Sequence, residues 1–222
     1  MSHTVRIWDL PTRLFHWSLA VSIVALVVSA KLGGNAMVWH LRLGYVVLAL
    51  LLFRVVWGLV GGRWSRFSAF LYTPGHVLRY LRGQERPDDN AGHSPVGALS
   101  VFALMGVVAL QVGTGLLSDD EIAFAGPLTS LVSNDWVSRA TGLHTDIGQY
   151  LIVGLVALHL LAVALYVLVK KKKDMVSAMV VGDKRLPTPV TPSRDDAASR
   201  LAALVVFGLC SGAVWWLVGL GT

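Results

Sequence analysis

The chain has 222 residues, of which 55% are hydrophobic and 14% are charged, and its mean hydropathy is +0.63. A soluble domain carries about a quarter charged residues, so this composition excludes an ordinary soluble protein and predicts an integral membrane protein. The net charge of +6 does not indicate nucleic-acid binding, because the basic residues lie beside apolar runs, where membrane topology explains them. The single cysteine, Cys210, excludes an intramolecular disulfide and a C-x-x-C-H haem-attachment site.

Five apolar runs, each long enough to cross a bilayer, follow one another along the chain. A short polar segment precedes the first, with Asp9 as a candidate helix cap and Pro11 near the first turn. A turn at Gly33 and Gly34 joins the first two runs, whereas longer polar loops and a Pro-rich linker join the others. The predicted spans are 14–30, 37–60, 95–117, 144–169 and 197–219, with loops at 61–93 and 119–142 and the linker at 184–196.

The distribution of Lys and Arg predicts the orientation of the five spans. With the N-terminus in the cytoplasm, fifteen basic residues face the cytoplasm and three face outward, and the positive-inside rule favours this arrangement. The cytoplasmic set is Arg6, Arg13, Arg63, Arg66, Arg79, Arg82, Arg86, Lys170–Lys173, Lys184, Arg185, Arg194 and Arg200, and the outer set is Lys31, Arg42 and Arg139. A signal peptide is the alternative for the first run, since VVSA at 27–30 resembles a cleavage site, but His16-Trp17 is unusual in such a peptide.

Four of the seven histidines lie in or at the edge of the predicted spans: His16, His40, His144 and His159. A histidine inside a bilayer is costly unless it has a partner or faces a cavity. His144 and His159 are fifteen positions apart, which on a regular helix is about 60° around the axis and about 22 Å along it. The topology places His40 and His144 in the outer half of the membrane and His16 and His159 in the inner half, although His16 lies at a shallower depth than His159. Since neutral imidazole is an axial ligand of haem iron, the pattern predicts two bis-histidine haems.

Histidines in membrane spans also have other uses. A lone buried histidine is often simply hydrogen-bonded to a neighbouring helix, and a zinc or copper site needs three or four ligands at one depth. His3 belongs to the terminus, whereas His76 and His93 belong to the cytoplasmic loop and are expected to be solvated. For His93, at the membrane edge, a part in a quinone site is the alternative.

Three arginines are candidates for contact with the anionic propionates of a haem. Arg42 is the candidate for the propionates of the outer haem, and Arg13 or Arg54 is the candidate for those of the inner haem. The alternative for all three arginines is that their side chains extend towards lipid headgroups. The run Lys170–Lys173 is expected to set topology and to contact anionic lipid. The outer side is acidic and could dock a basic cytochrome, with a plain solvated loop as the alternative; its acidic residues are Asp119, Asp120, Glu121, Asp135 and Asp146.

Three motifs, together with the two-histidine fourth span, resemble the bacterial cytochrome b561 family, which includes the b-type cytochrome subunit of nickel–iron hydrogenases. The motifs are VRIWDLPTRLFHW at 5–17, LGY with LLFRVVWG within 43–58, and GHSPVGALS at 92–100. The resemblance covers roughly residues 5–183 and implies an all-α membrane four-helix bundle with two b haems, so the expected core is residues 1–183. The linker at 184–196 and an additional C-terminal transmembrane helix in 197–222 lie outside the family pattern and are expected from the apolar runs alone. The resemblance also implies that His16, His40, His144 and His159 are the haem ligands, in the pairs His16/His159 and His40/His144.

The function expected from these observations is electron transfer in the bacterial inner membrane, between quinone and a periplasmic c-type cytochrome or hydrogenase. An electron-transfer subunit is favoured over a stand-alone enzyme, because the short outer loops leave no room for a redox domain. One alternative is a self-contained quinone-linked oxidoreductase, such as a superoxide oxidase. The other is a non-redox transporter whose histidines relay protons.

Overall fold

The computed structural model describes residues 2–86, 89, 91–169 and 174–221, and within these residues the chain is predominantly helical. Five described helices are long and apolar enough to cross a membrane, which confirms an all-α integral membrane protein. The long helices are α1 (Leu10–Leu32), α2 (Ala36–Val60), α4 (Pro95–Gly115), α6 (Gln149–Leu168) and α8 (Ala197–Val218). The shorter elements are β1 (His3–Arg6), η1 (Phe67–Ala69), α3 (Pro74–Leu81), η3 (Thr129–Leu131), α5 (Asn134–Gly142), η4 (Leu143–Gly148), α7 (Asp174–Val181), β2 (Asp183–Leu186) and η5 (Gly219–Gly221).

The chain divides into two compact units, each assembled from segments that are far apart in sequence. The first unit comprises Met1–Phe15, Arg54–Ala103 and Ala157–Val206, and the second comprises His16–Phe53, Leu104–Val156 and Phe207–Thr222. The division falls within each of the five long helices, so every span contributes residues to both units.

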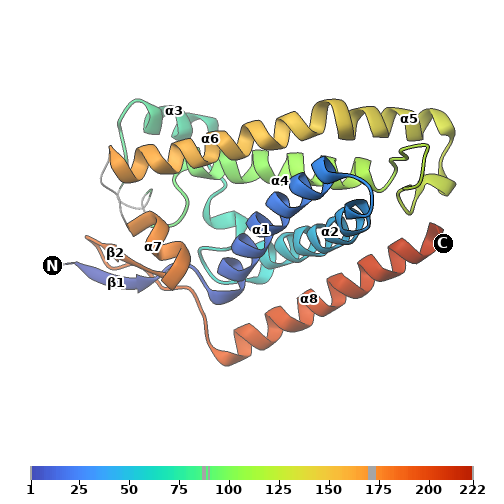
Figure 1. Ribbon diagram of the computed structural model, residues 1–222. Helices are drawn as coiled ribbons and strands as arrows, with labels where there is room; N and C mark the ends of the chain where they lie inside the picture. Colours follow the sequence, from blue (N-terminus) through green and yellow to red (C-terminus); the bar gives the residue numbers. More distant parts are fainter. Residues whose placement is uncertain (1, 87–88, 90, 170–173, 222) are drawn as a thin grey trace. The chain divides into compact units, whose positions relative to one another are not determined.

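In the first unit, β1 pairs with β2 in an antiparallel two-stranded sheet, with His3 opposite Leu186 and Arg6 opposite Asp183 (Figure 1). Gly182 makes the turn between α7 and β2 with a φ of 94°, a conformation that favours glycine. Its carbonyl oxygen accepts hydrogen bonds from the amides of Ile7 and Trp8. This sheet was not predicted from the sequence, because two four-residue strands of mostly polar residues are too short to show a hydrophobic alternation.

Asp9 is the central polar residue of the first unit. Its side chain is fully buried and accepts a hydrogen bond from the amide of Thr12 at 2.8 Å, which confirms the expected cap at the start of α1. The same carboxylate accepts from the hydroxyl of Ser65 at 2.8 Å, the amide of Gly62 at 3.1 Å and the indole of Trp57 at 3.3 Å. One residue therefore joins the start of α1 to the end of α2 and to the loop that follows it.

The segment 61–93 was expected to be a polar loop, but it contains η1 and α3. Thr73 caps α3 through its side-chain oxygen, which accepts from the amide of His76, and Pro74 occupies the first helical position. His76 is not solvated as expected: its Nε2 lies 2.7 Å from Oδ1 of Asp89, and its side chain is only 13% exposed. The cap, the proline and the helical spacing of Val77, Tyr80 and Leu81 were all present in the sequence, but the helix has only eight residues and lies in a polar segment.

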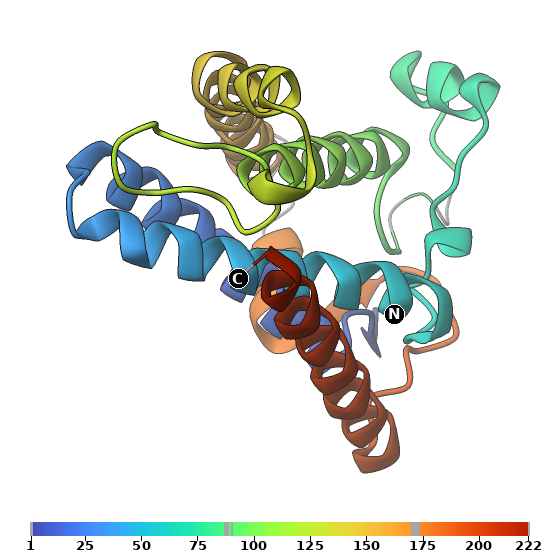
Figure 2. The ribbon, with the colours of Figure 1, turned by 90° about the vertical axis from the view of Figure 1, so that its right-hand side faces the viewer.

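In the second unit, a tight turn at Gly33 and Gly34 reverses the chain between α1 and α2 (blue, Figure 2), as expected. Both glycines have positive φ values, of 63° and 51°. The apolar core of this unit is formed by buried residues of three helices, with partly buried α1 side chains packed against them. The buried residues are Val47, Leu51, Val108 and Ile152, and the α1 residues are Leu19, Ile23 and Leu26.

The helix that carries His144 begins ten residues earlier than expected. Helix α5 starts at Asn134 and continues without a break through the π-helical turn η4 into α6, whereas the sequence predicted a loop that ends at Gly142. The polar composition of α5 resembles a loop, yet it holds no proline, and Gly142 itself has helical φ and ψ. The run Lys170–Lys173, to which a topological role was assigned, lies outside the described residues.

Candidate functional site

The second unit brings His40 and His144 together. His40 lies in the first half of α2 and His144 in the π-helical turn η4, and their ring centroids are 6.0 Å apart with an angle of 88° between the planes. The two residues predicted to form the outer pair are therefore neighbours. The calculation of 60° between His144 and His159 does not hold, however, because it assumed a regular helix and a π turn has more residues per turn.

Each ring in this pair is held by a backbone carbonyl through Nδ1. His40 Nδ1 lies 3.0 Å from the carbonyl oxygen of Leu26, and His144 Nδ1 lies 2.8 Å from that of Gln111. A carbonyl oxygen can only accept, so Nδ1 carries the proton in each neutral ring. Nε2 then keeps its lone pair, and this is the tautomer that binds a metal ion while a carbonyl fixes the ring orientation.

The separation of the rings fits a single metal ion between them. A first-row metal ion lies about 2 Å from a ligating imidazole nitrogen, and that nitrogen lies about 1 Å from the ring centroid. Two axial imidazoles therefore place their centroids about 6 Å apart, which matches the observed 6.0 Å. Gly44, one turn after His40 in α2, leaves open space, since a Cβ built there meets no atom within 4 Å. The residues present thus fit a bis-histidine haem.

The other predicted pair, His16 and His159, does not share a unit. His16 lies in the second unit, with its ring edge-on to that of Trp17 at 5.1 Å, and His159 lies in the first. Pairing them remains a prediction from the sequence.

The three candidate arginines have different surroundings. Arg42 is exposed, with its guanidinium 5.3 Å from the centre of the Trp39 ring. Arg13 is engaged within its unit, because its Nη1 donates to the carbonyl oxygen of Val180 at 2.6 Å and its Nη2 lies 4.0 Å from Asp195.

Arg54 is the most buried of the three, with 3% of its surface exposed. Its guanidinium lies against three aromatic rings, 4.7 Å from the centre of Phe67 and 6.0 Å from those of Phe15 and Phe70. Among the described residues, Nη1 has no hydrogen-bond partner. A buried guanidinium with an unused donor suits an anionic or carbonyl oxygen.

Gln111 is a site residue that was not predicted from the sequence. Besides its carbonyl contact with His144 Nδ1, its side-chain Nε2 donates to the backbone oxygen of His144 at 2.9 Å. The signal was present, because Gln111 is the one amide side chain in the apolar run 95–117 and such residues bond between membrane helices.

The acidic loop at 119–121 has internal structure. Oδ1 of Asp120 accepts from the amides of Ile122, Ala123 and Phe124 at 3.0, 2.9 and 2.9 Å. These hydrogen bonds, led by that from Phe124, hold the pKa of Asp120 below its usual range. The carboxylate thus stabilises its own loop, and docking of a basic protein there stays a prediction.

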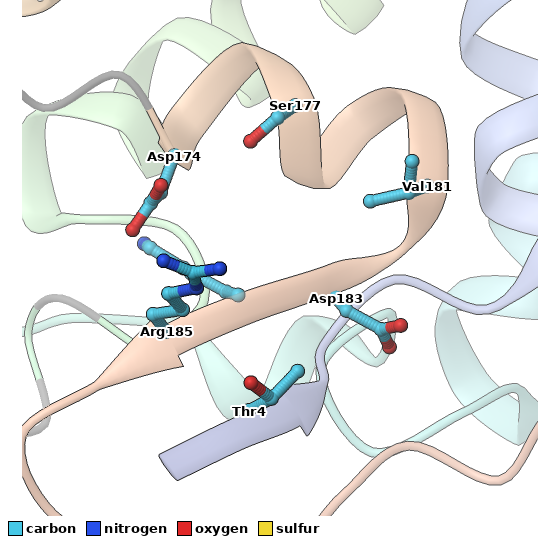
Figure 3. A pocket seen from close by; sticks show the side chains of 7 residues that line it. Thr4, Asp174, Ser177, Val181, Asp183 and Arg185 are labelled. Atoms are coloured by element: carbon cyan, nitrogen blue, oxygen red, sulfur yellow. The ribbon is translucent and has the colours of Figure 1, made fainter. Parts of the chain in front are cut away.

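A cavity of a different kind lies in the first unit, beside the two-stranded sheet (Figure 3). It measures about 420 Å³ and is lined from β1, α7 and β2 by Thr4, Asp174, Ser177, Val181, Asp183, Lys184 and Arg185. Its lining holds two carboxylates and two basic side chains, which balance in formal charge.

The comparisons with known proteins agree with this chemistry. The family model described as prokaryotic cytochrome b561 matches residues 7–182. A probable Ni/Fe-hydrogenase B-type cytochrome subunit of Azotobacter chroococcum mcd 1 is 28% identical, over 80% of this chain and 87% of the relative. A protein of the same description from Rhodobacter capsulatus is 26% identical, over 82% of this chain and 81% of the relative. No solved structure matches the chain.

The family model covers most of the chain, and its haem chemistry agrees with the histidine pair of the second unit. With its five apolar helices, the chain is therefore a multi-pass membrane protein of the prokaryotic cytochrome b561 family, a haem b cytochrome with an electron-transfer role.

Proposed function

We propose that the chain is a di-haem subunit of the bacterial inner membrane that passes electrons between quinone and a periplasmic redox partner. The observation that carries this proposal is the His40/His144 pair, whose 6.0 Å separation and Nδ1 hydrogen bonds suit two axial ligands. When bound, each haem supplies a one-electron iron couple whose potential depends on ligation and burial. The pair His16 and His159 is proposed as the second set of ligands.

In this proposal the protein orients the histidine ligands and compensates the negative charge of the haem propionates. The carbonyl oxygens of Leu26 and Gln111 fix the tautomers of His40 and His144 and make both imidazoles more basic. Arg54 is proposed to bind an inner propionate, because its buried Nη1 lacks a partner among the described residues. Arg42 is proposed to serve the outer haem. Arg13 is a weaker candidate, since Val180 and Asp195 already engage it.

The partner is proposed from the relatives and from the charge pattern. The named relatives are probable B-type cytochrome subunits of Ni/Fe hydrogenases, which favours a hydrogenase over a c-type cytochrome. The excess of Lys and Arg on one side supports a cytoplasmic N-terminus, which leaves the acidic loop at 119–121 on the periplasmic side. We propose one core at residues 1–183, a linker at 184–196 and a C-terminal helix at 197–222 that is available for assembly.

Electron transfer by the purified chain tests this proposal. In liposomes, a reduced quinone should reduce the haems, and continuous turnover should require an added periplasmic electron acceptor or donor protein. Failure of quinol to reduce the haems would contradict the proposed quinone exchange. Steady consumption of superoxide with quinone and no protein partner would instead support a stand-alone quinone-linked oxidoreductase.

A further inference from the structure

We propose that Gln111 is the positioning residue of His144, and that it sets the direction in which this imidazole presents Nε2. The inference rests on the proposed function, because it treats His144 as a haem ligand. It assigns to Gln111 a role that neither the family resemblance nor the relatives supply.

Gln111 and His144 are joined by two hydrogen bonds that run in opposite directions. His144 Nδ1 donates to the backbone oxygen of Gln111 at 2.8 Å, and Gln111 Nε2 donates to the backbone oxygen of His144 at 2.9 Å. The first bond holds the ring, and the second holds the peptide that carries the ring. Thr114 is a poorer partner, since its hydroxyl lies 3.4 Å from His144 Nδ1 and already donates to Leu110 at 2.8 Å.

The bond to the backbone matters because His144 lies in a π-helical turn. Such turns are rare and are found most often at functional sites. If Leu143–Gly148 returned to a regular α-helix, each turn would hold about one residue fewer. The His144 side chain would then rotate by about 100° relative to the helix that follows. A side-chain donor on the carbonyl of His144 stabilises the π turn, and thereby the direction of the imidazole.

Two glycines leave the space that this arrangement needs. A Cβ built on Gly148 would collide with Oε1 of Gln111, and a Cβ built on Gly115 would lie 2.9 Å from Cε1 of His144. The amide of Gln111 and the ring of His144 thus pack directly against helix backbone. Two other glycines of the same helices, Gly113 and Gly154, have no atom within 4 Å of the position that a Cβ would take.

The two ends of the Gln111 amide are not equivalent. Nε2 is bonded to His144, whereas Oε1 is buried and has no hydrogen-bond partner among the described residues. The donor should therefore carry the positioning role, and loss of the acceptor should cost little. This asymmetry predicts that methionine, which has no donor, fails, and that glutamate fails when its carboxyl group is ionised, because a carboxylate keeps acceptors but cannot donate to His144.

The test compares Gln111→Met, and Gln111→Glu at a pH at which the new carboxyl group is ionised, with the wild-type chain purified with haem. We expect the haem affinity of the outer site to fall about 10-fold, the lower end of the loss that follows removal of an outer-shell partner, because His144 Nδ1 keeps its bond to the backbone oxygen of residue 111. The low-spin electron paramagnetic resonance signal of that site should shift or become heterogeneous. The helical circular dichroism and the signal of the inner haem should not change.

Glycine substitutions provide a second route with matched controls. Gly148→Ala should reproduce the spectral change of Gln111→Met by displacing the amide, whereas Gly113→Ala and Gly154→Ala should leave both haem signals as in the wild type. A wild-type outer signal and affinity in both Gln111 variants would overturn the inference. So would an equal response of Gly148→Ala and Gly154→Ala.

The His40→Ala variant separates this inference from the proposed function. If His40→Ala loses one haem while the Gln111 variants keep both unchanged, the ligand pair stands and Gln111 has no positioning role. If His40→Ala keeps its full haem content, the ligand assignment itself is wrong.

Discussion

The imidazole planes of His40 and His144 stand at 88° to each other, with 6.0 Å between their centroids. Separate contacts produce this crossed arrangement, because Leu26 in α1 orients one ring and Gln111 in α4 orients the other. Each ring has its own carbonyl partner, on a different helix. The angle is therefore a property of the helix packing in this unit, and it should persist when a haem is bound.

Crossed axial ligands predict a recognisable spectroscopic signature. Two perpendicular imidazole planes interact with different iron d orbitals and keep them nearly equal in energy, which makes the g tensor of a low-spin ferric haem strongly anisotropic. We expect one haem of the oxidised protein to give such a signal by electron paramagnetic resonance at low temperature, and His144→Ala to remove it. A rhombic signal from both haems, typical of parallel planes, would show that the rings turn on binding.

Loss of the Asp9 carboxylate should destabilise the first unit. Asp9→Ala would leave the amides of Thr12 and Gly62 and the hydroxyl of Ser65 without a common acceptor in a fully buried position. We expect a loss of about 3 kcal/mol or more in the free energy of unfolding, since each buried group left without a partner costs about 1–3 kcal/mol. Denaturant unfolding in detergent measures this change in the free energy of unfolding. Asp135→Asn, at an exposed position, is the control, and an equal loss in both variants would contradict the role of Asp9.

Asp195 joins Arg6 and Leu10, near the N-terminus, to Arg200 of α8. The stability that these contacts provide should depend on pH below neutrality. Burial raises the pKa of Asp195, but hydrogen bonds from Arg200 and from the amide of Leu10, together with the charge of Arg6, lower it below its ordinary value. A carboxylate whose pKa is lower in the folded state contributes stability above its unfolded pKa of about 3.9, and that stability is lost as the pH falls through the folded pKa.

Asp195→Asn should therefore reduce stability at pH 7 and flatten the fall in stability below about pH 5. Unfolding measured between pH 7 and pH 2 for both proteins checks this expectation. Curves that stay parallel across that range would show that Asp195 contributes nothing to the acid response.

Five spans and a cytoplasmic N-terminus predict a periplasmic C-terminus. A fusion of alkaline phosphatase to the C-terminus should then be active in cells, whereas a fusion within the loop at 61–93 should be inactive, because the enzyme folds only on the outer side. The reverse pattern would contradict the orientation inferred from the Lys and Arg distribution.

The long helices and the proximity of His40 to His144 were predictable from the sequence because each leaves a local signal. Apolar runs of about twenty residues mark spans, and a histidine inside such a run stands out. The turn at Gly33 and Gly34 and the cap at Asp9 were equally local, and the structure confirms both.

The features that could not be predicted depend on contacts between distant segments. Pairing of β1 with β2 joins residues about 180 positions apart and has no sequence pattern of its own. The π turn at Leu143–Gly148 and the role of Gln111 depend on each other. The side chain of Gln111, on a different helix, donates to the backbone oxygen of His144 within that turn. A polar residue in an apolar span indicates a contact, but it does not say which backbone group it meets.

The most direct test is the ratio of haem to polypeptide in the purified chain and in its His159→Ala variant. We predict two haems per wild-type chain and one in the variant, with the strongly anisotropic signal of the His40/His144 site retained. A ratio of one haem or none in the wild-type chain, or a ratio that does not change in His159→Ala, would contradict the two-haem assignment.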